Sequence, residues 1–367
     1  MAHDALIIGA GPAGAACARL LAQAGRSVAL VEKMEFPRRK VCGEFLSAPT
    51  MAVLEECGIA ADFSAMAGPP VTRVGVYAGR ATLVTPRERL WGRALGRDHL
   101  DTLLRDAAVD AGAQLFQPTE VTALRRDGEI HLATLDDGRE LAAHTVIAAC
   151  GSWNAKGPFS LAAREAPSDL FAFKAHFTNA ALPPGLMPLL AFPGGYGGLV
   201  MSDHGRLSLS CCIRRDVLAK ARRRHGGKAA EAVIAHIRAT TRGVDRALSG
   251  AQLDGSTLAT GPIHPGIRPR VRDGVFIAGN LAGEAHPVIA EGISMAIQGA
   301  HVLARLLIAH QGEDYANAWR RRFAPRIHAA SVFAHLAMRG PTRALCRPLL
   351  AGFPQLMEFG ARLSGKA

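Results

Sequence analysis

Two glycine-rich segments have the residue types and spacing of a nucleotide-binding site. They occupy residues 9–14 (GAGPAG) and 278–283 (AGNLAG). In the first, the spacing G-x-G-x-x-G allows a tight turn, close approach of the backbone to a pyrophosphate, and close packing of the following helix. A helix that begins at such a turn also offers unpaired N–H groups to phosphate oxygens. Together the two segments predict two parts of one dinucleotide cradle.

The elements around residues 9–14 support a dinucleotide site. The apolar run 5–8 predicts a strand and residues 12–24 predict a helix, so the glycines lie at a strand-to-helix turn. A second apolar run, 27–31, ends at Glu32, whose carboxylate can accept hydrogen bonds from both hydroxyls of an adenosine ribose. An acidic residue at this place favours a free 2′-hydroxyl, and hence FAD or NAD over NADP.

The second glycine-rich segment predicts the flavin end of the site. Residues 274–279 have the pattern of a buried strand that ends beside Asn280, and a helix is expected from about residue 291 to residue 310. The start of such a helix can direct the positive end of its dipole at a flavin pyrimidine, which stabilises the anion formed on reduction. The Asn280 amide can bond ribityl hydroxyls.

The composition is that of a globular protein. The chain has 367 residues, of which 49% are hydrophobic, enough for a substantial core. It contains no apolar run of about 18 residues and no signal-peptide pattern, so we expect a cytoplasmic protein. The seven cysteines lack metal-ligand spacing, which predicts reduced thiols and no metal site.

The net charge of +12 comes largely from arginine clusters such as 222–224 and 320–322. Because no nucleic-acid module accompanies them, we interpret them as solvated helix faces and expect no nucleic-acid partner. Residues 320–363 mix arginines with apolar side chains. Such a segment can rest on a membrane, but we favour docking on the rest of the protein.

The segments between the two glycine-rich motifs predict an inserted domain. Residues 71–85 alternate in strand fashion, and residues 156–264 contain short apolar runs broken by proline and glycine, which is typical of an antiparallel sheet. We assign 1–70, 95–155 and 265–310 to a discontinuous FAD-binding domain, 71–94 and 156–264 to a substrate domain, and 311–367 to a C-terminal helical region.

In their order along the chain, these landmarks resemble the FAD-dependent oxidoreductases of the superfamily that contains para-hydroxybenzoate hydroxylase and geranylgeranyl reductase. The landmarks are 9–14 with Glu32, 41–44 (VCGE), Arg97 with 100–101, 192–196 (FPGGY), and 279–293. The resemblance implies an α/β protein (α+β overall) with a glutathione-reductase-like Rossmann FAD-binding domain, an inserted antiparallel β-sheet substrate domain and a helical C-terminus. The residues it assigns to cofactor binding are Gly9, Gly11, Pro12, Ala13, Gly14, Glu32, Lys33, Arg97, Gly279, Asn280, Gly292 and Ile293.

Two positions depart from the family pattern. Asn280 stands where the family usually has aspartate, and the amide keeps an acceptor oxygen but not the charge. Residues 149–152 (ACGS) replace an Asp-Gly motif that the hydroxylases use for both FAD and NAD(P)H. NAD(P)H is therefore a possible electron donor rather than one that the motif establishes.

Three residues are candidates for catalysis. By the resemblance, the Cys42 segment lies near the flavin in the reductase branch, where Cys42 would gate the substrate or donate a proton. Glu44 is a candidate general acid. His286 would lie close to the isoalloxazine. The alternatives are that Cys42 is a small buried hydrophobe and that His286 serves packing or capping.

The leading functional hypothesis is a monooxygenase that hydroxylates an aromatic or polyketide-like small molecule with NAD(P)H and O₂. A geranylgeranyl-reductase-like alkene reductase, or a dehydrogenase of an apolar substrate, is the second, favoured by the Cys42 segment and the missing Asp-Gly motif. The third is an electron-transfer flavoprotein whose arginine patches dock an electron donor protein.

Overall fold

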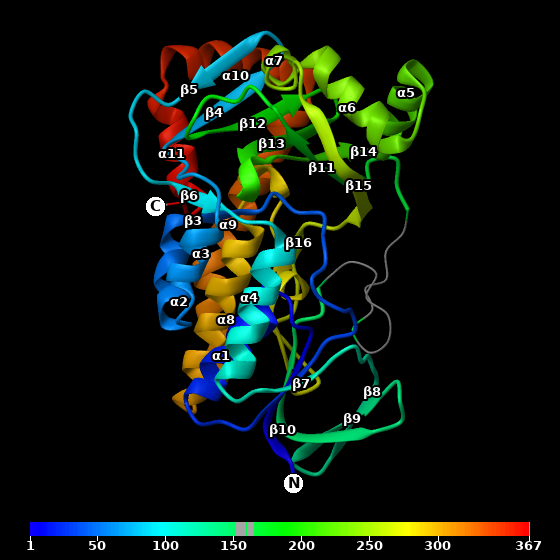
Figure 1. Cartoon of the computed structure of the whole chain (residues 1–367), viewed down its shortest axis with the longest axis vertical. Coiled ribbons are helices and arrows are strands. Elements are labelled where there is room, and N and C mark those ends of the chain that lie inside the picture. Colours follow the sequence, from blue (N-terminus) through cyan, green and yellow to red (C-terminus); the bar gives the residue numbers. More distant parts are fainter. Residues whose placement is uncertain (152–158, 160–164, 367) are drawn as a thin grey trace.

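The computed structural model describes residues 1–151, Phe159 and 165–366. Its first layer is an eight-stranded sheet in the order β17-β18-β10-β1-β2-β7, with β9 pairing β10 and β8 at its side (Figure 1). The strands are β1 (His3–Ile8), β2 (Val28–Val31), β7 (Gln114–Phe116), β8 (Val121–Asp127), β9 (Ile130–Leu135), β10 (Glu140–Ala148), β17 (Val271–Arg272) and β18 (Val275–Ile277). β1 runs parallel to β2 and β10, and β10 runs parallel to β18. Strands from residues 3–8, 140–148 and 275–277 thus lie side by side in one sheet.

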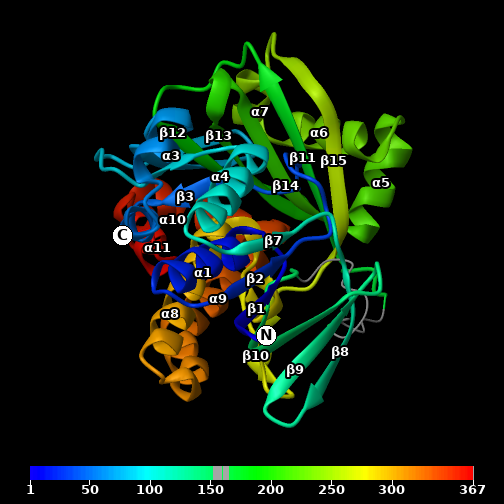
Figure 2. The same ribbon diagram turned by 60° about the horizontal axis from the view of Figure 1, so that its bottom comes forward.

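Helices α1 (Pro12–Gln23), α4 (Arg97–Asp110) and α8 (Gly292–Ile308) pack together beside this sheet (Figure 2). The helix predicted after the first glycine turn is confirmed, with Pro12 in its first turn. Its sequence, PAGAACARLLAQ, is rich in alanine, and ten of its twelve residues are buried. Small side chains let α8 approach closely, so the helix that begins at the first glycine-rich segment lies next to the first long helix after the second segment.

A second, seven-stranded sheet lies above the first layer in the view of Figure 1. Its order is β15-β11-β14-β13-β12-β4-β5. The strands are β4 (Arg73–Ala78), β5 (Ala81–Val84), β11 (Leu170–Thr178), β12 (Leu186–Phe192), β13 (Gly195–Met201), β14 (Leu207–Arg214) and β15 (Gln252–Ile263). The antiparallel prediction holds except at β12 and β4, which pair in parallel. Helices α5 (Arg215–His225), α6 (Ala229–Thr240) and α7 (Arg242–Ala247) cover one face with a second apolar core.

The remaining elements connect the two layers. Short pairs join β3 (Phe45–Ser47) to β6 (Gly92–Ala94) and β16 (Gly266–Ile267) to β19 (Gly283–Glu284), and α2 (Met51–Glu56) and α3 (Ala60–Met66) follow β3. The predicted helical C-terminus is confirmed as α9 (Tyr315–Met338), α10 (Gly340–Gly352) and α11 (Gln355–Leu363). The helices of the described residues are each too short or too polar to cross a bilayer. The fold is thus the mixed α/β architecture expected from the sequence.

Candidate active site

One cavity separates the two sheets, and it collects most of the predicted site residues. It holds about 2100 Å³, a figure that includes its open mouth. The predicted residues on its walls are Gly9, Gly11, Pro12, Ala13, Glu32, Lys33, Cys42, Glu44, Arg97, Gly279, Asn280, Gly292 and Ile293. Gly14 and His286 are not among the lining residues. The cavity therefore brings together both glycine-rich segments, as their spacing requires for one cradle.

The first glycine turn is shaped by close packing at two positions and by open space at a third. Gly9 has φ +103°, and a Cβ there would lie 2.8 Å from the carbonyl oxygen of Ala149. A Cβ on Gly14 would collide with the carbonyl oxygen of Gly9. At Gly11, by contrast, the nearest atom to such a Cβ is Nη2 of Arg97, at 4.0 Å. Gly11 therefore faces space that a ligand can fill.

Glu32, at the end of β2, is buried and held by three hydrogen bonds. Its carboxylate accepts from the N–H of Ala10 at 2.9 Å, the N–H of Met34 at 2.9 Å and Nη2 of Arg38 at 3.2 Å. A carboxylate offers about four acceptor positions, so about one is left. Glu32 can thus receive one ribose hydroxyl while Arg38 stays in place, not the two that the sequence suggested.

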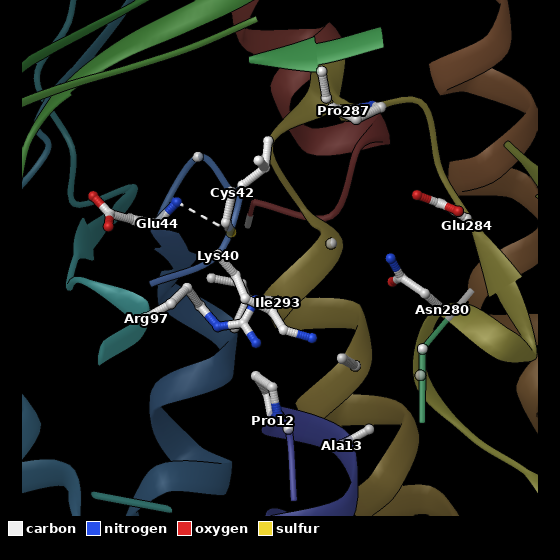
Figure 3. A pocket seen from close by; sticks show the side chains of 18 of the residues that line it. Pro12, Ala13, Lys40, Cys42, Glu44, Arg97, Asn280, Glu284, Pro287 and Ile293 are labelled. Atoms are coloured by element: carbon white, nitrogen blue, oxygen red, sulfur yellow. Dashed lines mark hydrogen bonds between the residues drawn. The ribbon is translucent and has the colours of Figure 1, made fainter. Parts of the chain in front are cut away.

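Three basic side chains gather near the start of α1. Arg97 forms a two-pronged ion pair with Asp101, at 2.6 and 2.7 Å, and Arg97 and Lys40 extend toward Pro12 (Figure 3). Burial, together with the charges of Arg38 and Arg97, lowers the pKa of Lys40 from 10.5 to about 8. A diphosphate would neutralise this crowding of like charges. The residues present therefore fit the pyrophosphate of a dinucleotide.

The start of α8 forms another part of the cavity wall. Gly292 and Ile293 line it, and no side chain caps the helix start, so its first N–H groups are available to a ligand. Asn280 lies across the cavity from Arg97 (Figure 3). Its carbonyl oxygen accepts a hydrogen bond of 2.6 Å from Nη1 of Arg268, which fixes the backbone of the second glycine-rich segment. This part of the wall suits the polar edge of a flavin ring.

Cys42 is half-buried in the loop between β2 and β3. Its sulfur accepts a hydrogen bond of 3.4 Å from the N–H of Glu44, and the thiol is near enough to the Arg97 guanidinium to affect the pKa of that group. Both donors would stabilise negative charge on the sulfur. The thiol thus lines the cavity between the basic cluster and the second sheet, where Ser210 Oγ lies 3.2 Å from the position of a Cβ on Gly43.

Glu44 belongs to a buried polar network that reaches the second sheet. Its carboxylate points away from Cys42 (Figure 3), forms an ion pair with Lys174 and accepts a hydrogen bond of 2.9 Å from His176. Arg39 Nη2 lies 3.0 Å from Nδ1 of His176. Because a guanidinium only donates, Nδ1 must accept, so the His176 ring carries its hydrogen on Nε2 and directs it at Glu44.

This network opposes the predicted general-acid role of Glu44. Burial alone would raise the pKa of its carboxyl, but the hydrogen bond from His176 and the charge of Lys174 outweigh burial and hold the pKa well below its usual range. Glu44 also has φ 62°, a left-handed conformation that is rare outside glycine. A charged side chain on a strained backbone, locked to another sheet, is suited to hold the Cys42 loop in place.

His286 lies behind the cavity wall and contacts a residue that lines it. Its Nδ1 is 2.9 Å from the hydroxyl of Tyr196, on β13. Burial and the neighbouring His335 lower the pKa of His286 from 6.5 to about 4, so the ring is neutral at pH 7. The pKa of Tyr196 is raised well above 10, chiefly by burial. His286 is thus placed to hold the Tyr196 hydroxyl with a ring that is neutral at pH 7.

We expect His286 to make the protein less stable in mild acid. Between pH 6.5 and 4 the unfolded chain protonates this ring while the folded protein does not, so stability falls as the pH falls through this window. The free energy of unfolding is measured in urea at pH 7 and at pH 5. Its decrease between the two pH values should be about 2 kcal/mol smaller in His286→Gln than in the wild type. His144→Gln, at an exposed histidine, serves as the control. Equal pH dependence in both variants would show that His286 protonates normally in the fold.

The sequence reasoning missed the partners of Glu44 and a contact of Lys366, which follows the last helix. Lys174 and His176 stand in the buried strand FAFKAHF, on the face opposite Phe173 and Phe177, and a charge inside such an alternating run is a signal that could have been used. The Nζ of Lys366 is 2.8 Å from Glu291, the residue before α8. No local pattern indicates that pair.

Together, the glycine turns, the Rossmann-type sheet and the inserted sheet that closes over the cavity define an FAD-dependent oxidoreductase. The sequence model of the FAD binding domain family matches residues 2–319. The chain therefore belongs to this family, and FAD is its cofactor. When bound, FAD supplies hydride and single-electron chemistry, and the protein supplies binding, orientation and proton management.

Three known proteins illustrate the range of the relatives. Menaquinone reductase of Mycolicibacterium smegmatis is 25% identical over 335 residues, which cover 86% of this chain and 79% of that protein. Digeranylgeranylglycerophospholipid reductase 3 of Methanosphaera stadtmanae is 24% identical over 350 residues, 88% of this chain and 82% of that one. The structure of the flavin-dependent brominase Bmp2 matches with a TM-score of 0.80 at 22% identity, covering 100% of this chain and 94% of its own.

Proposed function

We propose that this protein uses reduced FAD to saturate a carbon–carbon double bond of an elongated apolar substrate. The observation that carries the proposal is the position of the Cys42 thiol, between the basic end of the cavity and a wall of the second sheet. That wall is apolar and includes Met187, Leu189, Leu199 and Val200. The names of the two reductases that align along most of the chain specify a lipid-soluble quinone and a phospholipid, which supports the same substrate class.

Such a reaction needs a hydride for one carbon and a proton for the other. Among the three predicted catalytic residues, Glu44 is held as a carboxylate and His286 is neutral. We therefore assign the proton to the Cys42 thiol, whose sulfur would keep the negative charge beside the Glu44 N–H and the Arg97 guanidinium. Solvent then returns the proton, and NAD(P)H or an electron donor protein returns two electrons to the oxidised cofactor.

The test is a single turnover of the FAD-loaded protein. The protein is reduced chemically without air, mixed with a menaquinone that has an unsaturated side chain, and the product mass is measured. Reduction of the quinone head to the quinol also adds two hydrogen atoms, so the product is first re-oxidised in air to restore the quinone. A gain of two hydrogen atoms that survives this step supports the proposal. Hydroxylation is the competing proposal, and it predicts a gain of one oxygen atom when an aromatic substrate, NAD(P)H and O₂ are supplied. Substrate-independent oxidation by an acidic carrier would favour the electron-transfer alternative.

The Cys42→Ala variant should reduce the same substrate about 10² to 10⁴ times more slowly than the wild type, because a positioned proton donor contributes about that factor. Its FAD content should stay unchanged, since the thiol is not needed for the glycine turns. Cys346→Ala, at a half-buried cysteine of α10, is the matched control. A Cys42→Ala rate equal to that of the control would remove Cys42 from the chemistry and leave the substrate assignment standing.

A further inference from the structure

The last two helices and the short connection between them leave six large apolar side chains exposed. We call them the C-terminal apolar surface. Its members, with exposed fractions from 40% to 74%, are Leu345, Leu349, Phe353, Leu356, Phe359 and Leu363. Soluble proteins seldom leave so many large apolar groups together without a binding role. In Figure 1, α10 and α11 lie on the outer flank of the molecule, beside β4 and β5.

The spacing shows that this exposure is built into the helices. In α11, Leu356, Phe359 and Leu363 fall on one side of the helix, while Met357 and Ala361 are buried against the protein. The helix therefore packs one apolar face against the rest of the protein and leaves a second apolar face exposed. No residue of α10 is buried among those whose side chains the structure describes, so its apolar residues do not complete the core either.

The charge around this surface is positive. Arg339 and Arg362 are exposed at its edges, and from Gly340 onward Glu358 is the one acidic residue of the sequence. The whole chain has a net charge of +12. A second copy of such a basic chain would be repelled, whereas an anionic surface would be attracted. Apolar side chains flanked by arginine on a helix too short to span a bilayer are typical of a helix that lies in a membrane interface.

We infer that the C-terminal apolar surface rests on a membrane that contains anionic lipids. The apolar side chains would enter the boundary between headgroups and acyl chains, and the arginines would stay at headgroup level. The surface is fixed to the rest of the protein: Lys366 binds Glu291, and Nη1 of Arg343 donates to the carbonyl oxygens of Phe192 and Met338 at 3.1 and 2.9 Å. A docked surface would therefore hold the cavity at a set position above the membrane.

The test measures binding of the FAD-loaded 367-residue chain to sedimented vesicles of phosphatidylcholine with and without phosphatidylglycerol. The variant carries Leu345→Glu, Phe353→Glu and Phe359→Glu. The matched control carries the same charge change at three exposed apolar residues elsewhere, Val109→Glu, Leu253→Glu and Val271→Glu. We expect the wild type and the control to bind the anionic vesicles, and the variant to lose roughly tenfold or more in partitioning. Added salt should weaken the binding that remains.

Three outcomes would overturn the inference. The wild type does not sediment with anionic vesicles, or both triple variants lose binding equally, which would show charge attraction without a docking face. Alternatively, the wild type forms a dimer in solution that only the C-terminal variant abolishes, which would make a second copy the occupant. Circular dichroism and FAD content confirm that each variant is folded. Because binding is measured without substrate, this result is independent of the proposed reaction.

Discussion

Replacing Gly11 with alanine should leave the fold intact and lower the affinity for FAD by about 10- to 100-fold, or ~1.4–2.8 kcal/mol. In the protein, a Cβ at this position meets only Nη2 of Arg97, at 4.0 Å, so the added methyl group strains nothing. It would, however, fill the space beside the start of α1 where a pyrophosphate must approach the backbone. The measurement is a titration of the apoprotein with FAD, followed by flavin fluorescence.

Two further glycines give this experiment its controls. Gly14→Ala would drive a methyl group into the carbonyl oxygen of Gly9, so it should lower the stability of the apoprotein as well as FAD affinity. Gly352→Ala, in α10, meets nothing within 4 Å and should change neither. If Gly11→Ala binds FAD as the wild type does, the pyrophosphate does not lie over this turn.

The elements around the first turn could be predicted because their signals are local. The strand, the glycines, the helix and Glu32 follow one another within residues 3–32, and each pattern depends on neighbours in sequence. The first layer of the fold is therefore readable from hydrophobic periodicity and one motif. The parallel pairing of β12 with β4 could not be predicted in this way. It joins segments more than a hundred residues apart, and neither segment has a local sequence pattern that indicates it.

The chemistry of the site was less predictable, for the same reason. The sequence places Glu44 near Cys42, which suggests a proton donor, but its protonation depends on partners that lie 130 and 132 residues away in the chain. Only the folded sheet brings Lys174 and His176 to the carboxylate. Similarly, the low pKa of His286 follows from its burial and from His335 on α9. The residue types were found from the sequence, whereas their charge states needed the structure.

The Lys174→Met variant should lose about 3–5 kcal/mol of unfolding free energy, because it leaves the Glu44 carboxylate buried without its cation. Both side chains are 1% exposed, so water cannot compensate. The measurement is urea unfolding of the apoprotein at pH 7. Lys220→Met, at an exposed lysine of α5, makes the same chemical change and should cost less than about 1 kcal/mol. A Lys174→Met loss no greater than that of the control would mean that the ion pair does not hold the Cys42 loop to the second sheet.

The double variant Lys174→Met with Glu44→Gln separates the lost attraction from the unpaired charge. A neutral amide beside methionine should recover part of the stability, because no buried charge remains. The pH dependence gives an independent check. Since the pKa of Glu44 is lowered in the fold, its contribution is present above the ordinary value of 4.5 and is lost as the pH falls below it. Acid sensitivity in that range should therefore diminish with Glu44→Gln, and if it does not, Glu44 is not charged in the folded protein.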